Sequence, residues 1–204
     1  EEQKNEFVSI VSHELKTPIT SIHGSLSLLK KSLSDDINLD KNEAFDILDI
    51  ADANCNRMTK LIKDLLDFNK MDRQNVPFNL KTHFLNELIE SSISNFNSRK
   101  ITISFECDSD VTICADGERF LQVINNLIDN AIKYSDKDIK INIRERVDSI
   151  YIDVIDEGIG ISKDNLENLF MSFYQVDSSD SRSFSGIGLG LSICQILLRE
   201  MQGS

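Results

Sequence analysis

A histidine on the polar side of a helical segment is the first residue whose type and place suggest chemistry. His13 opens the segment HELKTP, in which Glu14, Thr17 and Pro18 follow it. An imidazole has an ordinary pKa of about 6.5, so near pH 7 it offers a neutral, nucleophilic nitrogen. A carboxylate beside it can take up the other ring proton and orient the ring. A lone histidine on a helix is more often an incidental surface residue, so the hypothesis depends on its neighbours.

The helix that carries His13 must hold it in solvent. Apolar residues recur along this segment at spacings of three and four, which indicates an amphipathic helix with one buried side; they are Phe7, Val11, Leu15, Pro18, Ile22, Leu26 and Leu29. At about 100° per residue, His13 projects nearly opposite to them. We therefore predict an exposed His13. Pro18 has no amide proton, and it should bend the helix just beyond His13.

A second amphipathic helix follows a polar stretch over residues 30–42. The same alternation of three and four resumes there; its members are Leu48, Ala51, Cys55, Met58, Ile62 and Leu65. Two such helices form an antiparallel hairpin, and a lone hairpin leaves much apolar surface in water. The pattern therefore predicts a homodimer through a four-helix bundle. Pro77 and the polar residues before it mark a linker, which gives two domains, residues 1–75 and 76–204.

The periodicity changes beyond the linker. Apolar and polar residues alternate near residues 101–105, 139–143 and 152–154, which is typical of half-buried strands. Helical spacing occurs at residues 85–96, 120–131 and 189–198. We expect an α+β two-layer sandwich in which helices cover one face of a sheet. The predicted fold class is thus multidomain, with an all-α hairpin followed by this sandwich.

The segment around His13 resembles the H-box of the HisKA dimerisation and phosphoacceptor domain of histidine kinases. The resemblance includes FVS before His13 and Ile19-Thr20 after Pro18. It implies that His13 accepts a phosphoryl group and that Glu14 orients and stabilises its ring. It also implies that Thr17 holds Glu14 or positions a water that removes the phosphoryl group from a partner.

Residues 126–135, NLIDNAIKYS, resemble the N-box of the GHKL family of ATP-binding domains. Asn126 and Asn130 stand four apart on one helix face, and their amide oxygens suit Mg²⁺, which binds nucleotide phosphates at the same time. The resemblance makes both asparagines candidate nucleotide and metal ligands. Lys133 is then placed to reach a phosphate, and Tyr134 to pack on the sugar or base.

Two glycine-containing segments resemble the G1 and G2 boxes of the same family. In DEGIG, Asp156 would accept a hydrogen bond from the adenine amino group, and Gly158 and Gly160 would permit close approach. In the second segment, helix-opening amides would meet phosphates; its residues are Gly186, Ile187, Gly188, Leu189, Gly190 and Leu191. Residues 170–173 resemble the F-box, whose phenylalanines we expect to pack beneath a loop. The polar residues 178–185 indicate an ATP lid.

Other phosphoryl-transfer and nucleotide-binding classes are excluded. No Gly-Lys-Ser/Thr follows a glycine-rich turn, and the lysine and catalytic-loop motifs of eukaryotic-type protein kinases are missing. The glycines do not open a βαβ dinucleotide-binding unit either.

Two departures from the family stand out. Gln175 occupies a position where many relatives carry an arginine, for which Arg182 is the alternative. The chain also ends at Ser204, where relatives continue into closing strands, and begins at Glu1. We expect a piece of a longer protein, shortened at its C-terminus, whose upstream sensor segments can include a membrane anchor.

Composition agrees with a folded cytoplasmic core. The net charge of −12 argues against nucleic acid or direct membrane contact, and no apolar run approaches the length of a membrane span. The four cysteines lack the close pairs of a zinc site, so we expect reduced, buried thiols.

The predicted function is an ATP- and Mg²⁺-dependent histidine kinase that phosphorylates His13. By resemblance, it passes the group to an aspartate of a response-regulator receiver domain, with phosphatase activity in reverse. Two alternatives are a GHKL ATPase that works by conformational change, which leaves His13 unexplained, and a catalytically silent dimeric scaffold.

Overall fold

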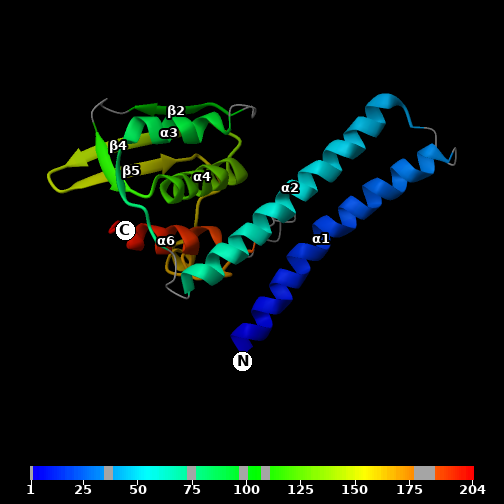
Figure 1. Cartoon of the computed structure of the whole chain (residues 1–204), viewed down its shortest axis with the longest axis horizontal. Coiled ribbons are helices and arrows are strands. Elements are labelled where there is room, and N and C mark those ends of the chain that lie inside the picture. Colours follow the sequence, from blue (N-terminus) through cyan, green and yellow to red (C-terminus); the bar gives the residue numbers. More distant parts are fainter. Residues whose placement is uncertain (1, 35–38, 73–76, 97–100, 107–110, 177–186) are drawn as a thin grey trace.

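The structure, a computed structural model, describes residues 2–34, 39–72, 77–96, 101–106, 111–176 and 187–204. It has two parts, a hairpin of long helices and a mixed α/β domain that lies beside the second helix (Figure 1). The predicted order of an all-α hairpin followed by an α+β sandwich is confirmed. The predicted boundary near residue 75 lies outside the described residues.

The hairpin consists of α1 (Glu2–Leu33) and α2 (Lys41–Asp72), which run antiparallel (Figure 1). A reciprocal capping box starts α2, because Asp40 Oδ1 accepts from the Glu43 amide at 2.9 Å and Glu43 Oε2 accepts from the Asp40 amide at 2.9 Å. Neither of these helices, nor any other in the described ranges, has the length and apolarity that a membrane span requires.

The predicted apolar seams are only partly covered within one chain. Pro18 is buried, and Val11, Leu15, Ile22 and Leu29 are half-buried. Leu26, Leu48 and Ile62 are exposed instead. Cys55 and Cys114 are exposed too, so the expectation of buried thiols is wrong for both; Cys194 is buried.

Within its described residues, the second domain has two small sheets and three helices of eight or more residues. Its elements are β1 (Lys81–Phe84), α3 (Leu85–Ser94), β2 (Ile103–Glu106), β3 (Thr112–Ala115), α4 (Gly117–Tyr134), β4 (Ile139–Arg146), β5 (Ser149–Ile155), a short α5 (Lys163–Leu166) and α6 (Gly190–Glu200). Strands β1 and β3 pair antiparallel. Strand β4 pairs in parallel with β2 and antiparallel with β5, which makes that sheet mixed.

Helices α3 and α4 cover one face of the strands. Their fully or nearly fully buried Leu85, Ile89, Ile124 and Ile128 meet Ile141 of β4 in one core. Asp116 starts α4, since its Oδ1 accepts from the Arg119 amide at 3.2 Å. The predicted helices and the three predicted strand regions are confirmed, whereas β1, β3 and α5 were not predicted.

The second domain packs directly on α2 through a shared apolar core. Leu61 of α2 is 6% exposed and joins Val123 of α4 and Ile193 of α6 there. Beside this core, Asp67 is buried and accepts from Arg119 Nη1 at 3.3 Å and Gln122 Nε2 at 3.0 Å. The apolar contacts and this polar cluster fix where the sandwich sits along the hairpin.

The pKa of Asp64 on α2 provides a test of the packing between α2 and the second domain. Burial raises the pKa of its carboxyl from 3.8 to about 6, and the carboxylates of Asp67 and Asp129 add to the rise against the opposing pull of Lys60. Because the folded-state pKa lies above the unfolded value, Asp64 favours the folded state at low pH, and this contribution is lost as the pH rises through about 6.

We therefore expect Asp64→Asn to raise the melting temperature at about pH 7.5 and to change it little at about pH 4.5. Calorimetry across that range measures the difference. Asp49→Asn, an exposed change on the same helix, is the control. An equal effect of Asp64→Asn at both pH values would contradict the account.

Candidate functional site

His13 lies on the solvent side of α1, as its helical phase predicts. Its side chain is 78% exposed, while Glu14 beside it is 14% exposed. The Nδ1 atom of His13 is 3.5 Å from Glu14 Oε1, a distance at which a small movement makes a hydrogen bond. The carboxylate thus lies on the Nδ1 side of the ring rather than beside the other ring nitrogen, Nε2.

Arg57 of α2 holds the second oxygen of Glu14. Its Nη2 donates to Glu14 Oε2 at 3.1 Å, and its side chain is 33% exposed. Neither a motif nor helical periodicity pointed to Arg57 in the sequence. It could be found only from the register of the hairpin, which brings residues 43 positions apart together.

Thr17 does not hold Glu14 in this structure. Its hydroxyl donates to the backbone carbonyl of His13 at 3.3 Å, so Arg57 takes the place that one reading of the sequence gave to Thr17. Thr17 also lines an open groove of about 520 Å³ with His13, Lys16, Thr20 and Ser21. A position near a water that approaches His13 is thus compatible with its place on the helix.

Residues 173–175, at and just after the end of the F-box, line a cavity together with residues around His13. An open cavity of about 580 Å³ is lined on one side by Ser9, Ile10, His13 and Glu14 and on the other by residues 173–175. Gln175, where the family resemblance leads us to expect an arginine in many relatives, thus lines the same cavity as His13. The alternative Arg182 lies outside the described residues.

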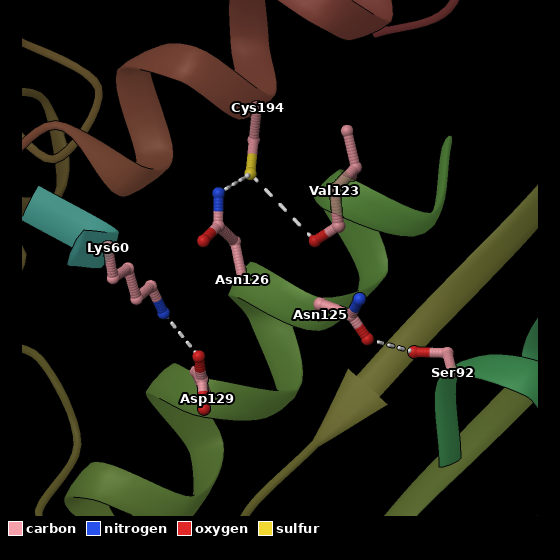
Figure 2. A network of polar contacts seen from close by, with 7 residues as sticks. All are labelled: Lys60, Ser92, Val123, Asn125, Asn126, Asp129 and Cys194. Atoms are coloured by element: carbon pink, nitrogen blue, oxygen red, sulfur yellow. Dashed lines mark hydrogen bonds and ion pairs between the residues drawn. The ribbon is translucent and has the colours of Figure 1, made fainter. Parts of the chain in front are cut away.

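Asn126 is buried between α4 and α6. Its Nδ2 donates to Cys194 Sγ at 3.7 Å, and Cys194 Sγ donates to the Val123 carbonyl at 3.9 Å (Figure 2). Burial raises the pKa of the Cys194 thiol to about 11, so it stays protonated and serves as a packing and hydrogen-bonding group. This contact occupies the Asn126 amide nitrogen.

The asparagines and their neighbours fit a magnesium–nucleotide complex. Because Nδ2 of Asn126 faces Cys194, its Oδ1 points away from that thiol (Figure 2), and an amide oxygen is a ligand that Mg²⁺ prefers. Asn130 lies one turn later on α4 and is half-buried. In the described ranges no cluster of three His, Cys, Asp or Glu side chains has the geometry of a metal site.

Lys133 and Tyr134 close the same helix. The Nζ atom of Lys133 lies 4.7 Å from the centre of the Tyr134 ring, and Tyr134 is exposed. The ammonium group and the aromatic ring are thus offered together at the C-terminal end of α4, one turn beyond Asn130.

The G1 segment packs against that end of α4. Asp156 directly follows β5 and is exposed, and its Oδ1 accepts from the Gly158 amide at 2.8 Å. A Cβ atom on Gly158 would lie 2.3 Å from the Tyr134 carbonyl oxygen, so no side chain fits there. Gly160 has a φ of +69° and open space around it, which favours glycine for its backbone alone.

The G2 segment is locked to the F-box. Gly188 has a φ of +74°, a Cβ there would lie 2.7 Å from the Tyr174 carbonyl, and the Phe173 amide donates to the Gly188 carbonyl at 3.0 Å. Gly190 begins α6 beside the Asn126 side chain, and Leu191 is half-buried in the first turn. Gly186 and the predicted lid, residues 178–185, lie outside the described residues.

Phe173 of the F-box packs against α2 and Phe170 is exposed, while the loop beneath which we expected both to pack lies outside the described residues. The Phe173 ring meets Phe68 of α2 edge-on at 5.5 Å between centroids, whereas Phe170 is exposed. Phe173 adopts a φ of 69°, a strained conformation for a bulky residue, which its bond to Gly188 and the Phe68 contact hold in place.

Helix α4 also contacts helices α2 and α3 through polar residues that the sequence did not single out. Asp129 forms an ion pair with Lys60 of α2, and Asn125 Oδ1 accepts from Ser92 Oγ of α3 at 2.7 Å (Figure 2). The Asp129 pair places the helix of Asn126 and Asn130 against the hairpin, one turn beyond Arg57 on α2.

Two family profiles match the chain. Residues 3–74 match the HisKA profile, described as the His Kinase A (phospho-acceptor) domain. Residues 115–204 match the HATPase_c profile, described as histidine kinase-, DNA gyrase B- and HSP90-like ATPase. The two matches follow the hairpin and the larger part of the sandwich.

Curated relatives match along almost the whole chain. The sensor histidine kinase WalK of Bacillus subtilis is 32% identical over all of this chain and 34% of its own length. The signal transduction histidine-protein kinase ArlS of Staphylococcus aureus is 34% identical over 99% of this chain and 45% of its own. The chain therefore spans less than half the length of these relatives.

A solved structure shares the fold. The histidine kinase AdeS of Acinetobacter baumannii superposes with a TM-score of 0.65 and 25% identity, over 92% of this chain and 86% of the matched one.

We expect Gly158→Ala to destabilise the sandwich by about 1 to 3 kcal/mol, because the new methyl group overlaps a backbone carbonyl. Urea unfolding measures the loss. Gly24→Ala is the matched control, since nothing lies within 4 Å of its Cβ position on α1 and alanine favours a helix. A Gly158→Ala protein as stable as the wild type would show that this part of the G1 segment is placed wrongly.

Proposed function

The chain belongs to the histidine kinases, as a HisKA domain joined to a HATPase_c domain, and on that premise we propose that it transfers the γ-phosphoryl group of ATP to His13. The observation that supports this most is the exposed imidazole of His13 beside the largely buried carboxylate of Glu14. A histidine that only stabilised the hairpin would have no use for either feature.

In the proposed step, the lone pair of His13 Nε2 forms a bond to the γ-phosphorus. The bond from that phosphorus to the β,γ-bridging oxygen breaks, and ADP leaves with the electron pair. Glu14 Oε1 faces Nδ1, so it stabilises the positive charge that grows on the ring and can accept the Nδ1 proton. The contribution of the chain is mainly positioning and charge balance.

The nucleotide would lie along the C-terminal half of α4. We assign adenine recognition to the exposed Asp156, whose Oδ1 is already turned to the Gly158 amide and whose other oxygen can accept from an exocyclic amino group. Gly158, Gly160, Gly188, Gly190 and Leu191 would shape the backbone around the nucleotide, with Gly186 as a further candidate. Lys133 and Tyr134 would meet phosphate and sugar or base.

Magnesium would be held by the amide oxygens of Asn126 and Asn130 together with the phosphates. Bound there, it would offset the phosphate charge in a chain whose own net charge is −12. The Cys194 contact supports this role for Asn126, because it fixes which end of the amide is available.

We propose that the active form is a homodimer through the hairpin. Large apolar residues remain in water near its connection in a single chain; they are Leu26, Leu28, Leu33, Phe45, Leu48 and Ile50. A second copy of the hairpin offers the same residues in return, so a four-helix bundle buries both sets.

The phosphohistidine would pass its group to an aspartate of a receiver domain, with Thr17 near the water for the reverse dephosphorylation. The groove beside Thr17 and Thr20 leaves His13 open to such a partner. Since ATP is the phosphoryl donor, we place this core in the cytoplasm.

Incubation with γ-labelled ATP and Mg²⁺ should place acid-labile, base-stable phosphate on the wild type. His13→Ala should remove it completely, and Asn130→Ala should reduce its rate at least about a hundredfold by weakening the metal–nucleotide complex. Labelled protein on gels measures both.

His23→Ala is the matched control, since His23 is an exposed histidine on the same helix and its loss should leave labelling intact. Labelling that survives His13→Ala would contradict the proposal. Hydrolysis of ATP without labelling of the wild type would favour a GHKL ATPase instead.

A further inference from the structure

We propose that Arg57 is a positioning residue for the phosphorylation of His13, acting through Glu14 to decide which ring nitrogen carries the proton. This inference rests on the proposed phosphorylation of His13 and adds a residue from the opposite helix to it. It stands on the linked contacts of Arg57, Glu14 and His13.

Consecutive residues on a helix do not normally face each other. They point about 100° apart, and His13 and Glu14 follow this rule, since one side chain is 78% exposed and the other 14%. Glu14 leans toward α2 and His13 points into water. The approach of Glu14 Oε1 to His13 Nδ1 at 3.5 Å therefore needs an influence from outside the helix.

Arg57 supplies that influence. Its guanidinium donates to Oε2 of Glu14 at 3.1 Å from α2, which leaves Oε1 on the side of His13. A carboxylate that is largely withdrawn from water is costly without a partner. Without Arg57, rotation of Glu14 into solvent is the favourable response, and Oε1 then leaves Nδ1.

The consequence is a choice of tautomer. A carboxylate at Nδ1 favours the ring with its proton on Nδ1, which keeps the Nε2 lone pair free for phosphorus. When Glu14 turns away, the exposed ring takes both neutral tautomers, and a share of the molecules carries its proton on the attacking nitrogen. Arg57 thus raises the reactive fraction without touching ATP.

Autophosphorylation kinetics and nuclear magnetic resonance together test the positioning role of Arg57. Arg57→Ala should lower the maximal autophosphorylation rate about tenfold and leave the ATP concentration for half-maximal rate unchanged. Arg57→Lys should restore part of the rate, because it keeps the charge but loses the planar guanidinium. In a Glu14→Gln background, Arg57→Ala should have little further effect, since both residues act through one contact.

The second readout needs no kinase activity. In protein labelled with nitrogen-15, the imidazole shifts of His13 at about pH 9 should show the Nδ1-protonated tautomer in excess. Arg57→Ala should move them toward the Nε2-protonated form, while Lys70→Ala, an exposed cation on the same helix, should not.

A rate within twofold of wild type in Arg57→Ala, or unchanged His13 shifts, would overturn the inference. A fall in melting temperature with unchanged shifts would mean that Arg57 only ties the two helices together, which also overturns it. If the wild type takes up no phosphate, the proposed function fails, and the tautomer measurement still decides the role of Arg57.

Discussion

The phase of α1 is the constraint on which the rest of this structure depends. A helix that buries Pro18 and half-buries Val11 and Leu15 must carry His13 on its opposite side. The adjacent Glu14 falls between these two sides, where α2 reaches it through Arg57. The phase of this one helix thus sets both the exposure of His13 and the Glu14–Arg57 contact that we propose orients its ring.

Helix α4 connects this arrangement to the proposed nucleotide site. Its apolar side fills the core of the sandwich through Ile124 and Ile128. Its polar residues bind three different helices, through Asn125 to α3, Asn126 to α6 and Asp129 to α2 (Figure 2). The asparagines proposed to meet magnesium are therefore held in register with the hairpin that carries His13.

Residue types and periodicity predicted the features that depend on local sequence. The exposure of His13 followed from helical phase alone, and α4 and α6 followed from apolar spacing. Strands β1 and β3 were missed because their residue types do not alternate: Lys81–Phe84 has one large apolar residue, and Thr112–Ala115 has its apolar residues in a row. Ile101 precedes β2 rather than belonging to it.

The contacts that join distant residues could not be predicted in this way. Lys60 and Asp129 are 69 positions apart and Asn126 and Cys194 are 68 apart, so their pairing depends on how the helices dock. The hydroxyl of Thr17 could bond to Glu14 or to the backbone, and only the structure shows that it donates to the carbonyl of His13. The register of the hairpin likewise decides that Arg57, rather than another cation, meets Glu14.

The position of the phosphoryl group on the protein tests the central claim most directly. Phosphorus–nitrogen couplings in the labelled, phosphorylated chain distinguish the two ring nitrogens and the three histidines. The account predicts a single phosphohistidine, at Nε2 of His13. Phosphate on Nδ1 of His13, which Glu14 faces, or on His23 or His83, would contradict it.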